Sequence, residues 1–144
     1  MFRLKFKTQN SKFKTRRKRN KKLEWFENTE IKRIIKELSK DKEFVHINPG
    51  RIFCFSTTGS KSRAIARIWS FPKIFQQALC IEPAYVIEVI SERFNKMDKN
   101  EKIKVIIHEL LHIPRNFSGS LLPHKYGNKR IDKEVERIYQ QLYF

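Results

Sequence analysis

Hydrophobic residues recur at helical spacing both early and late in the chain. The pattern LEWFENTEIKRIIKELSK predicts a helix over residues 23–40, with Asn28 or Thr29 as its N-cap. A second amphipathic pattern, IDKEVERIYQQLYF, predicts that a helix over residues 131–144 closes the chain. Between these two helices the pattern changes to that of strands and one further helix.

Runs of β-branched and aromatic residues predict three strands in this intervening part. They are RIFCFST (51–57), IARIWSF (65–71) and AYVIEVI (84–90). Periodicity alone does not distinguish strand from helix for IARIWSF, and we favour the strand. SERFNKMD, residues 91–98, is expected to form a short turn or helix.

A third helix is predicted over residues 99–113, KNEKIKVIIHELLHI. Its apolar residues repeat with the helical period, and Asp98 can cap its first turn. Pro114 ends it, because proline cannot continue the hydrogen-bond ladder and also constrains the residue before it. A loop of Asn, Ser and Gly residues follows.

Positive charge concentrates at the N-terminus. The chain has 144 residues and a net charge of +17, and residues 1–22 hold eleven lysines and arginines without one acidic residue, which leaves +6 for the remainder. A segment with so much like charge and so little apolar content cannot build a core. We therefore predict a basic, disordered tail over residues 1–22 and one domain over residues 23–144.

The cysteines and the hydropathy of the chain indicate a soluble protein of a reducing compartment. Cys54 and Cys80 lie far apart and form no CxxC pair, so the sequence contains no disulfide framework. No apolar run approaches the ~20 residues of a membrane helix, and the basic start does not lead into the apolar stretch of a signal peptide. We expect a cytoplasmic protein without membrane contact.

The stretch HELLH, residues 108–112, contains the clearest candidate chemistry. On a helix, His108 and His112 project from the same face about one turn apart, where both imidazoles can reach one metal ion. Glu109 points aside from them. This is the HExxH pattern, in which the glutamate takes a proton from the attacking water and later returns it to the leaving amine.

A third metal ligand has to come from elsewhere, because catalytic zinc normally has three protein ligands and one open position. His124 is the natural candidate, since Pro114 ends the helix and Gly119 allows the chain to reverse. The shorter HExxHxxGxxH spacing of the metzincins is absent. Glu134 and Glu136 in the following helix are the fallback candidates.

The apolar surroundings of the motif also favour a metal. Two imidazoles and a charged glutamate in the middle of IKVIIHELLHI would cost several kcal/mol of desolvation, and a bound metal compensates that cost. His46, in contrast, has no partner pattern, and we interpret it as a packed or surface residue.

The run from His108 to His124 resembles the metallopeptidase family of phages and archaea, small zincins similar to the SprT-like and minigluzincin enzymes. The stretches SKSRAIARIWSFPKIFQQAL and PAYVIEVISERFNKMD give weaker support, and the similarity covers roughly residues 44–143. The resemblance implies an α+β, zincin-like fold, with a twisted mixed sheet packed against the HExxH helix, N- and C-terminal helices, and an edge strand lining the substrate cleft. It also implies zinc at His108, His112 and His124, with acid–base catalysis by Glu109.

The implied reaction is hydrolysis of a peptide bond in a peptide or protein substrate. Glu109 would take the water proton, and the tetrahedral oxyanion would need a hydrogen-bond donor on the side away from the glutamate. Tyr126, two residues beyond His124, and Arg115, just past the helix, are the first candidates for that donor. A half-buried loop aromatic and a solvated surface cation are the competing interpretations of these two residues.

The basic tail points to DNA or RNA as a partner. Its eleven cations attract a phosphate backbone with an affinity that should fall steeply with salt. Phe2, Phe6 and Phe13 interleave with these cations and could stack on bases or seat the tail on the protein. Further cations lie outside the tail, at Lys61, Arg63, Arg67, Lys125, Lys129 and Arg130. A peptidase held on nucleic acid would act on associated proteins, as the SprT-like enzymes do.

Two other functions are open at this point. Zinc endoribonucleases of the YbeY type have an HxxxHxxxxxH motif, but here Glu109 directly follows the first histidine and the third histidine comes later, which favours peptide hydrolysis. A nucleic-acid-binding protein with a structural zinc would need a fourth ligand, such as His46 or Cys54, because structural zinc sites are closed.

Overall fold

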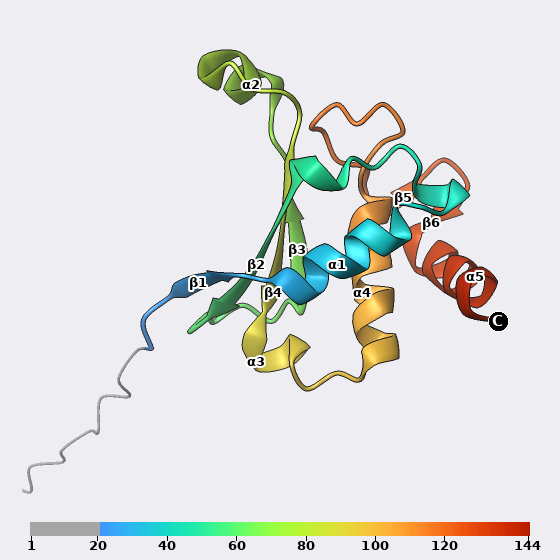
Figure 1. Ribbon diagram of the computed structural model, residues 1–144, viewed down its shortest axis with the longest axis horizontal. Coiled ribbons are helices and arrows are strands. Elements are labelled where there is room, and N and C mark those ends of the chain that lie inside the picture. The colour runs from blue at the N-terminus through green and yellow to red at the C-terminus, as the bar shows by residue number, and fades with distance from the viewer. Residues whose placement is uncertain (1–20) are drawn as a thin grey trace, which may run out of the picture.

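A four-stranded mixed sheet organises residues 21–144, the part of the chain that the computed structural model describes. Helices pack on one face of this sheet (Figure 1). The predicted α+β class is therefore confirmed. The predicted disorder of the tail over residues 1–22 falls almost entirely outside the described residues and stays a prediction.

The order of the strands across the sheet is β1-β2-β4-β3. The strands are β1 (Glu24–Glu27), β2 (Ile52–Thr58), β3 (Ala66–Trp69) and β4 (Tyr85–Ile90). β1 runs antiparallel to β2, β2 runs parallel to β4, and β3 runs antiparallel to β4. The three predicted strands are present, and β1 and β3 form the two edges of the sheet.

Five α-helices lie among the described residues. They are α1 (Thr29–Leu38), α2 (Lys73–Leu79), α3 (Ser91–Phe94), α4 (Lys99–Leu111) and α5 (Ile131–Tyr143). Short 3-10 turns occur at Lys42–Phe44 and Pro49–Arg51, and β5 (Lys125–Tyr126) pairs with β6 (Lys129–Arg130) in a small hairpin. Every helix within residues 21–144 is too short or too polar to cross a membrane.

The prediction of a helix over residues 23–40 is wrong for the first of these residues. Residues 24–27 form β1 rather than a helical turn, because the sheet offers them antiparallel pairing with β2 and offers Trp25 a hydrogen bond to Glu88. Tertiary pairing therefore outweighs the local helical spacing. The helix begins directly after Asn28, whose side-chain oxygen accepts a backbone N–H at 2.9 Å, as the predicted N-cap requires.

The N-terminus of α4 is fixed by a capping box. The Asp98 carboxylate accepts the Glu101 backbone N–H at 2.9 Å, and the Glu101 carboxylate accepts that of Asp98 at 3.1 Å. The buried stripe of the helix packs under the sheet and against α1 and α5; it comprises Ile103, Ile106, Ile107 and Leu110. Since His112 is the C-cap of α4, the helical spacing extends through the whole HELLH motif.

Candidate active site

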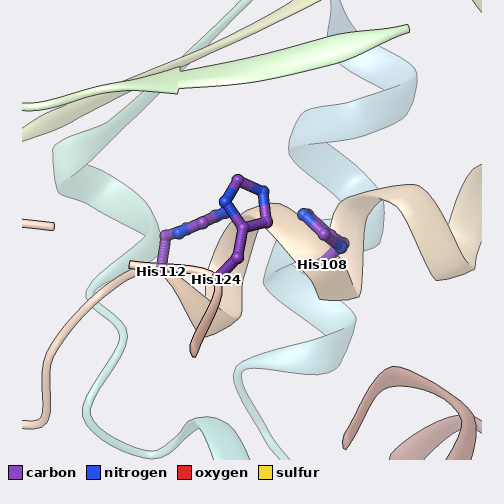
Figure 2. A group of neighbouring side chains, drawn as sticks. All are labelled: His108, His112 and His124. Carbon is purple, nitrogen blue, oxygen red and sulfur yellow. The ribbon is translucent and has the colours of Figure 1, made fainter. Parts of the chain in front are cut away.

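Three histidines converge at the C-terminal end of α4 (Figure 2). His108 and His112 come from the end of the helix, whereas His124 comes from the segment that leads into β5. Each side chain offers one ring nitrogen as a ligand atom, and these three atoms all lie within 4.8 Å of one another. The centres of the three rings are 4.6 to 5.2 Å apart. The fold thus brings together the three residues that the sequence predicts as metal ligands.

The loop that presents His124 is held by a buried tyrosine on β4. The Tyr85 hydroxyl accepts the Gly119 N–H at 2.8 Å and donates to the Ser120 carbonyl at 2.9 Å. Gly119 has a φ of +91°, and a side chain there would place its Cβ 2.4 Å from the Phe71 carbonyl oxygen. The predicted need for glycine at this reversal therefore has a steric reason as well as a conformational one.

An oxygen atom lies near Nδ1 of each helix histidine. Nδ1 of His112 lies 2.6 Å from the Leu122 carbonyl oxygen, and the Leu122 N–H donates to the His112 carbonyl at 2.7 Å. Nδ1 of His108 lies 3.5 Å from the Asp132 carboxylate. Because Nδ1 of each ring faces such an oxygen, we expect Nε2 to be the metal-binding atom of both histidines.

Burial favours the neutral form of the two helix histidines. Burial lowers the pKa of His108, and the neighbouring imidazoles of His112 and His124 lower it further against the opposing charge of Asp132. Burial also lowers the pKa of His112, although the Leu122 carbonyl opposes this effect. Neutral imidazole is the form that binds a metal, so these shifts favour metal binding at neutral pH.

Glu109 is a buried carboxyl group next to the histidine cluster. Only 7% of the residue is exposed. Burial raises the pKa of Glu109 to about 7, although the backbone N–H of Ile68 on β3 opposes this effect. A carboxyl group that titrates near neutral pH is well suited to accept and return protons.

A cleft of about 560 Å³ opens beside His108 and Glu109. Its walls are formed by α4, by the start of α5 and by the residues that lead into β3. The apolar lining consists of Ile65, Ala66, Met97, Val105 and Val135. The other charged residues of the lining are Arg63, Glu101, Lys104, Asp132 and Glu136. A substrate side chain can therefore be buried directly beside the candidate base.

The two predicted oxyanion donors do not line this cleft. Tyr126 is half-buried on β5 and packs against the hydrophobic core. Arg115 is exposed, and its charge contributes to the lowered pKa of His46, of which burial is the main cause. The catalytic role of Tyr126 and Arg115 stays a prediction.

The alternative ligands lie outside the cluster. Glu134 pairs with Arg137 at 2.8 Å, and Glu136 pairs with Lys104 at 2.7 Å. Within residues 21–144 the histidine cluster contains no fourth ligand, so neither His46 nor Cys54 joins it. A closed four-ligand site is not assembled by this part of the chain.

Two orienting groups of the site were not evident from the sequence. Asp132 looks like an ordinary acidic residue in the first turn of a helix, where the helix dipole favours one. The Leu122 carbonyl is a backbone group and leaves no signal in the residue type. Both depend on how the loop and α5 dock on α4.

One of three comparisons with known proteins identifies a family for this chain. Neither the search of curated proteins nor the search of solved structures found a match. A family model described as “putative phage metallopeptidase” matches residues 23–143, which include the histidine cluster and Glu109. The chain therefore belongs to this phage metallopeptidase family.

Proposed function

We propose that this protein is a zinc-dependent peptidase in which three histidines hold the metal and Glu109 is the general base. The observation that supports this most strongly is the convergence of His108, His112 and His124 beside a buried carboxyl group at a cleft. Membership of the family supports a metallopeptidase in general terms. The identity of the metal and the role of each residue are inferred from their chemistry.

The donor set fits zinc. Three imidazole ligands with one open position are typical of catalytic zinc, whereas magnesium and calcium prefer oxygen ligands. A tetrahedral site with bonds of about 2.1 Å needs nitrogen atoms about 3.4 Å apart. The observed limit of 4.8 Å is close enough for side-chain rotation to reach that spacing. When bound, zinc supplies Lewis acidity and lowers the pKa of a coordinated water.

Glu109 moves the protons in the proposed reaction. Its carboxylate takes a proton from the water that attacks the scissile carbonyl and passes it to the leaving amine nitrogen, so the C–N bond breaks after the C–O bond has formed. Burial alone favours the neutral form. A nearby cation lowers the pKa of a carboxyl group, so metal binding would leave Glu109 ionised and ready to act as a base.

The outer edge of β3 is the proposed docking site for the substrate backbone. In the described part of the chain β3 pairs with β4 alone, so no strand covers its other edge, where the Ile68 backbone N–H interacts with Glu109. An extended peptide can add to such an edge through main-chain hydrogen bonds. Ile65 and Ala66, at the start of β3, line the cleft beside Glu109, so a peptide docked there would pass the candidate base.

The lining of the cleft favours a peptide over RNA as the substrate. Four carboxyl groups, including that of Glu109, and only two cations line the cleft. This excess of negative charge repels phosphate groups. The apolar walls accept a hydrophobic side chain instead. We therefore expect cleavage next to apolar residues of the substrate.

Removal and return of the metal test this proposal. The purified chain is treated with a chelator, and its cleavage of a peptide library is followed by mass spectrometry. We expect cleavage to stop and to return with about one equivalent of zinc per chain. His124→Ala should lose zinc and activity, whereas Glu134→Gln, on the same helix as Asp132 but outside the cleft, should keep both. Full activity of the stripped chain, or cleavage of oligoribonucleotides in place of peptides, would contradict the proposal.

A further inference from the structure

The sheet face that points away from the helices carries exposed aromatic side chains. The pairing register and the alternation of side chains place the buried Ile90 and five at least partly exposed apolar residues on this outer face; the five are Trp25, Phe53, Phe55, Val86 and Trp69. Trp25 is 56% exposed, Trp69 50% and Phe53 45%. In Figure 1, α4 and α5 lie on the other side of the sheet. These two helices therefore leave the outer face uncovered, and its two tryptophans are half-exposed.

Glu88 holds both tryptophans in place at the centre of the outer face. One of its oxygens accepts the Trp25 indole N–H at 3.1 Å and the Thr57 hydroxyl at 2.7 Å, and the other accepts the Arg67 Nε–H. The Arg67 guanidinium in turn lies 5.3 Å from the centre of the Trp69 ring. Rings that are already fixed lose little conformational freedom when a partner binds.

The two tryptophans form separate stacking surfaces. They lie on opposite edge strands, three strand spacings or roughly 14 Å apart across the sheet, and are also offset by four residues, or roughly 13 Å, along the strands. A groove of about 360 Å³ lies between them, and its rim includes Leu23 and Ser60. This geometry suits a ligand with several planar apolar groups in succession.

The charge of the chain narrows the choice of partner. The eleven cations of residues 1–22 directly precede β1, which carries Trp25, and the whole chain has a net charge of +17. A second copy would be repelled by this charge, whereas a polyanion is attracted. Single-stranded nucleic acid combines a polyanionic backbone with exposed base faces that stack on aromatic side chains. A duplex keeps its bases stacked inside.

We propose that the outer face binds single-stranded nucleic acid. Bases stack on Trp25 and Trp69, and the net charge of +17 attracts the phosphate backbone. This surface lies on the opposite side of the sheet from Glu109 and does not depend on the proposed function. β3 links the two sites, because Trp69 points outward whereas the backbone of Ile68 interacts with Glu109.

Intrinsic fluorescence tests the proposal, because both tryptophans of the chain lie on this face. The full chain is titrated at physiological salt with an oligothymidylate and with an abasic oligonucleotide of the same length and charge. Only the oligothymidylate should quench the emission. In binding assays with the labelled oligothymidylate, Trp69→Ala should weaken the affinity about tenfold, and Trp69→Phe should restore most of it. Phe26→Ala, an exposed aromatic that points to the other side of β1, is the matched control.

Several results would overturn the proposal. Equal quenching by the two oligonucleotides, or equal affinity of Trp69→Ala and Phe26→Ala chains with unchanged circular dichroism, would exclude stacking on this face. The triple change of Phe2, Leu4 and Phe6 to Ser keeps every cation. If it alters the emission without nucleic acid, the N-terminal segment itself covers the face. Emission that depends on protein concentration would identify a second copy as the occupant.

Discussion

The Tyr85 hydroxyl connects the core of the sheet to the loop that presents His124. Tyr85→Phe removes this one oxygen and keeps the ring, which is fully buried, in place. Gly119 and Ser120 then lose their hydrogen-bond partner. The substitution therefore tests whether the position of His124 depends on this contact.

The size of the effect follows from the two lost bonds. The Gly119 N–H is left unpaired in a buried position, which costs about 1–3 kcal/mol. The Ser120 carbonyl belongs to an exposed residue and can turn to water, so its loss costs about 0.5–1.5 kcal/mol. We expect the free energy of unfolding to fall by about 2–4 kcal/mol. In the variant, zinc binding also has to order the loop that presents His124. This cost should weaken zinc affinity by about 5- to 30-fold.

Urea denaturation of the metal-free chain measures the first effect, and competition with a zinc indicator measures the second. The midpoint should fall without a change in the m-value. Tyr143→Phe, which removes the hydroxyl of a tyrosine that is 47% exposed, is the matched control and should change neither quantity. A Tyr85→Phe chain with wild-type stability and zinc affinity would refute the proposed role of the loop contact.

Three further predictions concern the orienting acid, the outer face and the tail. Asp132→Asn should lower zinc affinity about 10- to 100-fold while leaving the unfolding midpoint of the metal-free chain unchanged, since the Asp132 side chain is 72% exposed; unchanged affinity would remove Asp132 from the site. Burial raises the pKa of Glu88, but hydrogen bonds from Thr57, Arg67 and Trp25 outweigh it and leave the pKa below its ordinary value. The stabilisation by Glu88 is therefore present at neutral pH and is lost on acidification. Glu88→Gln should lower the free energy of unfolding by about 2 kcal/mol at pH 7, and this free energy should depend less steeply on acid pH than in wild type. Parallel pH profiles of the two proteins would contradict this. Changing Arg16, Arg17, Lys18 and Arg19 to Gln should reduce the salt slope of oligothymidylate binding by about 3, and an unchanged slope would exclude phosphate contacts by these residues.

Elements with local signals could be predicted from the sequence, whereas elements created by pairing could not. α4 follows from the cap at Asp98, an apolar repeat and the stop at Pro114, all of which lie within or beside the helix. β1 is different, because the spacing of Trp25 and Phe26 fits a helix and only pairing with β2, distant in sequence, makes these residues a strand. Local periodicity contains no information on such a partner.

The same distinction applies to the candidate site. The positions of His108, Glu109 and His112 relative to one another follow from helical geometry, so the spacing alone predicts them. The return of His124 was predictable as a possibility from a proline and a glycine. Its actual course depends on the buried contact with Tyr85, which is distant in sequence. The cleft depends on the docking of α5 against α4, which no local pattern encodes.

Zinc content and peptide cleavage, measured on the same preparations of wild type and Glu109→Gln, test the central claim most directly. Glu109 is not a ligand in the proposed site, and removal of a general base slows catalysis by about 10²- to 10⁴-fold. We predict about one zinc per chain in both proteins and efficient cleavage in wild type alone. Loss of zinc from Glu109→Gln, or cleavage at the wild-type rate, would contradict the assignment of Glu109 as the base of a zinc peptidase.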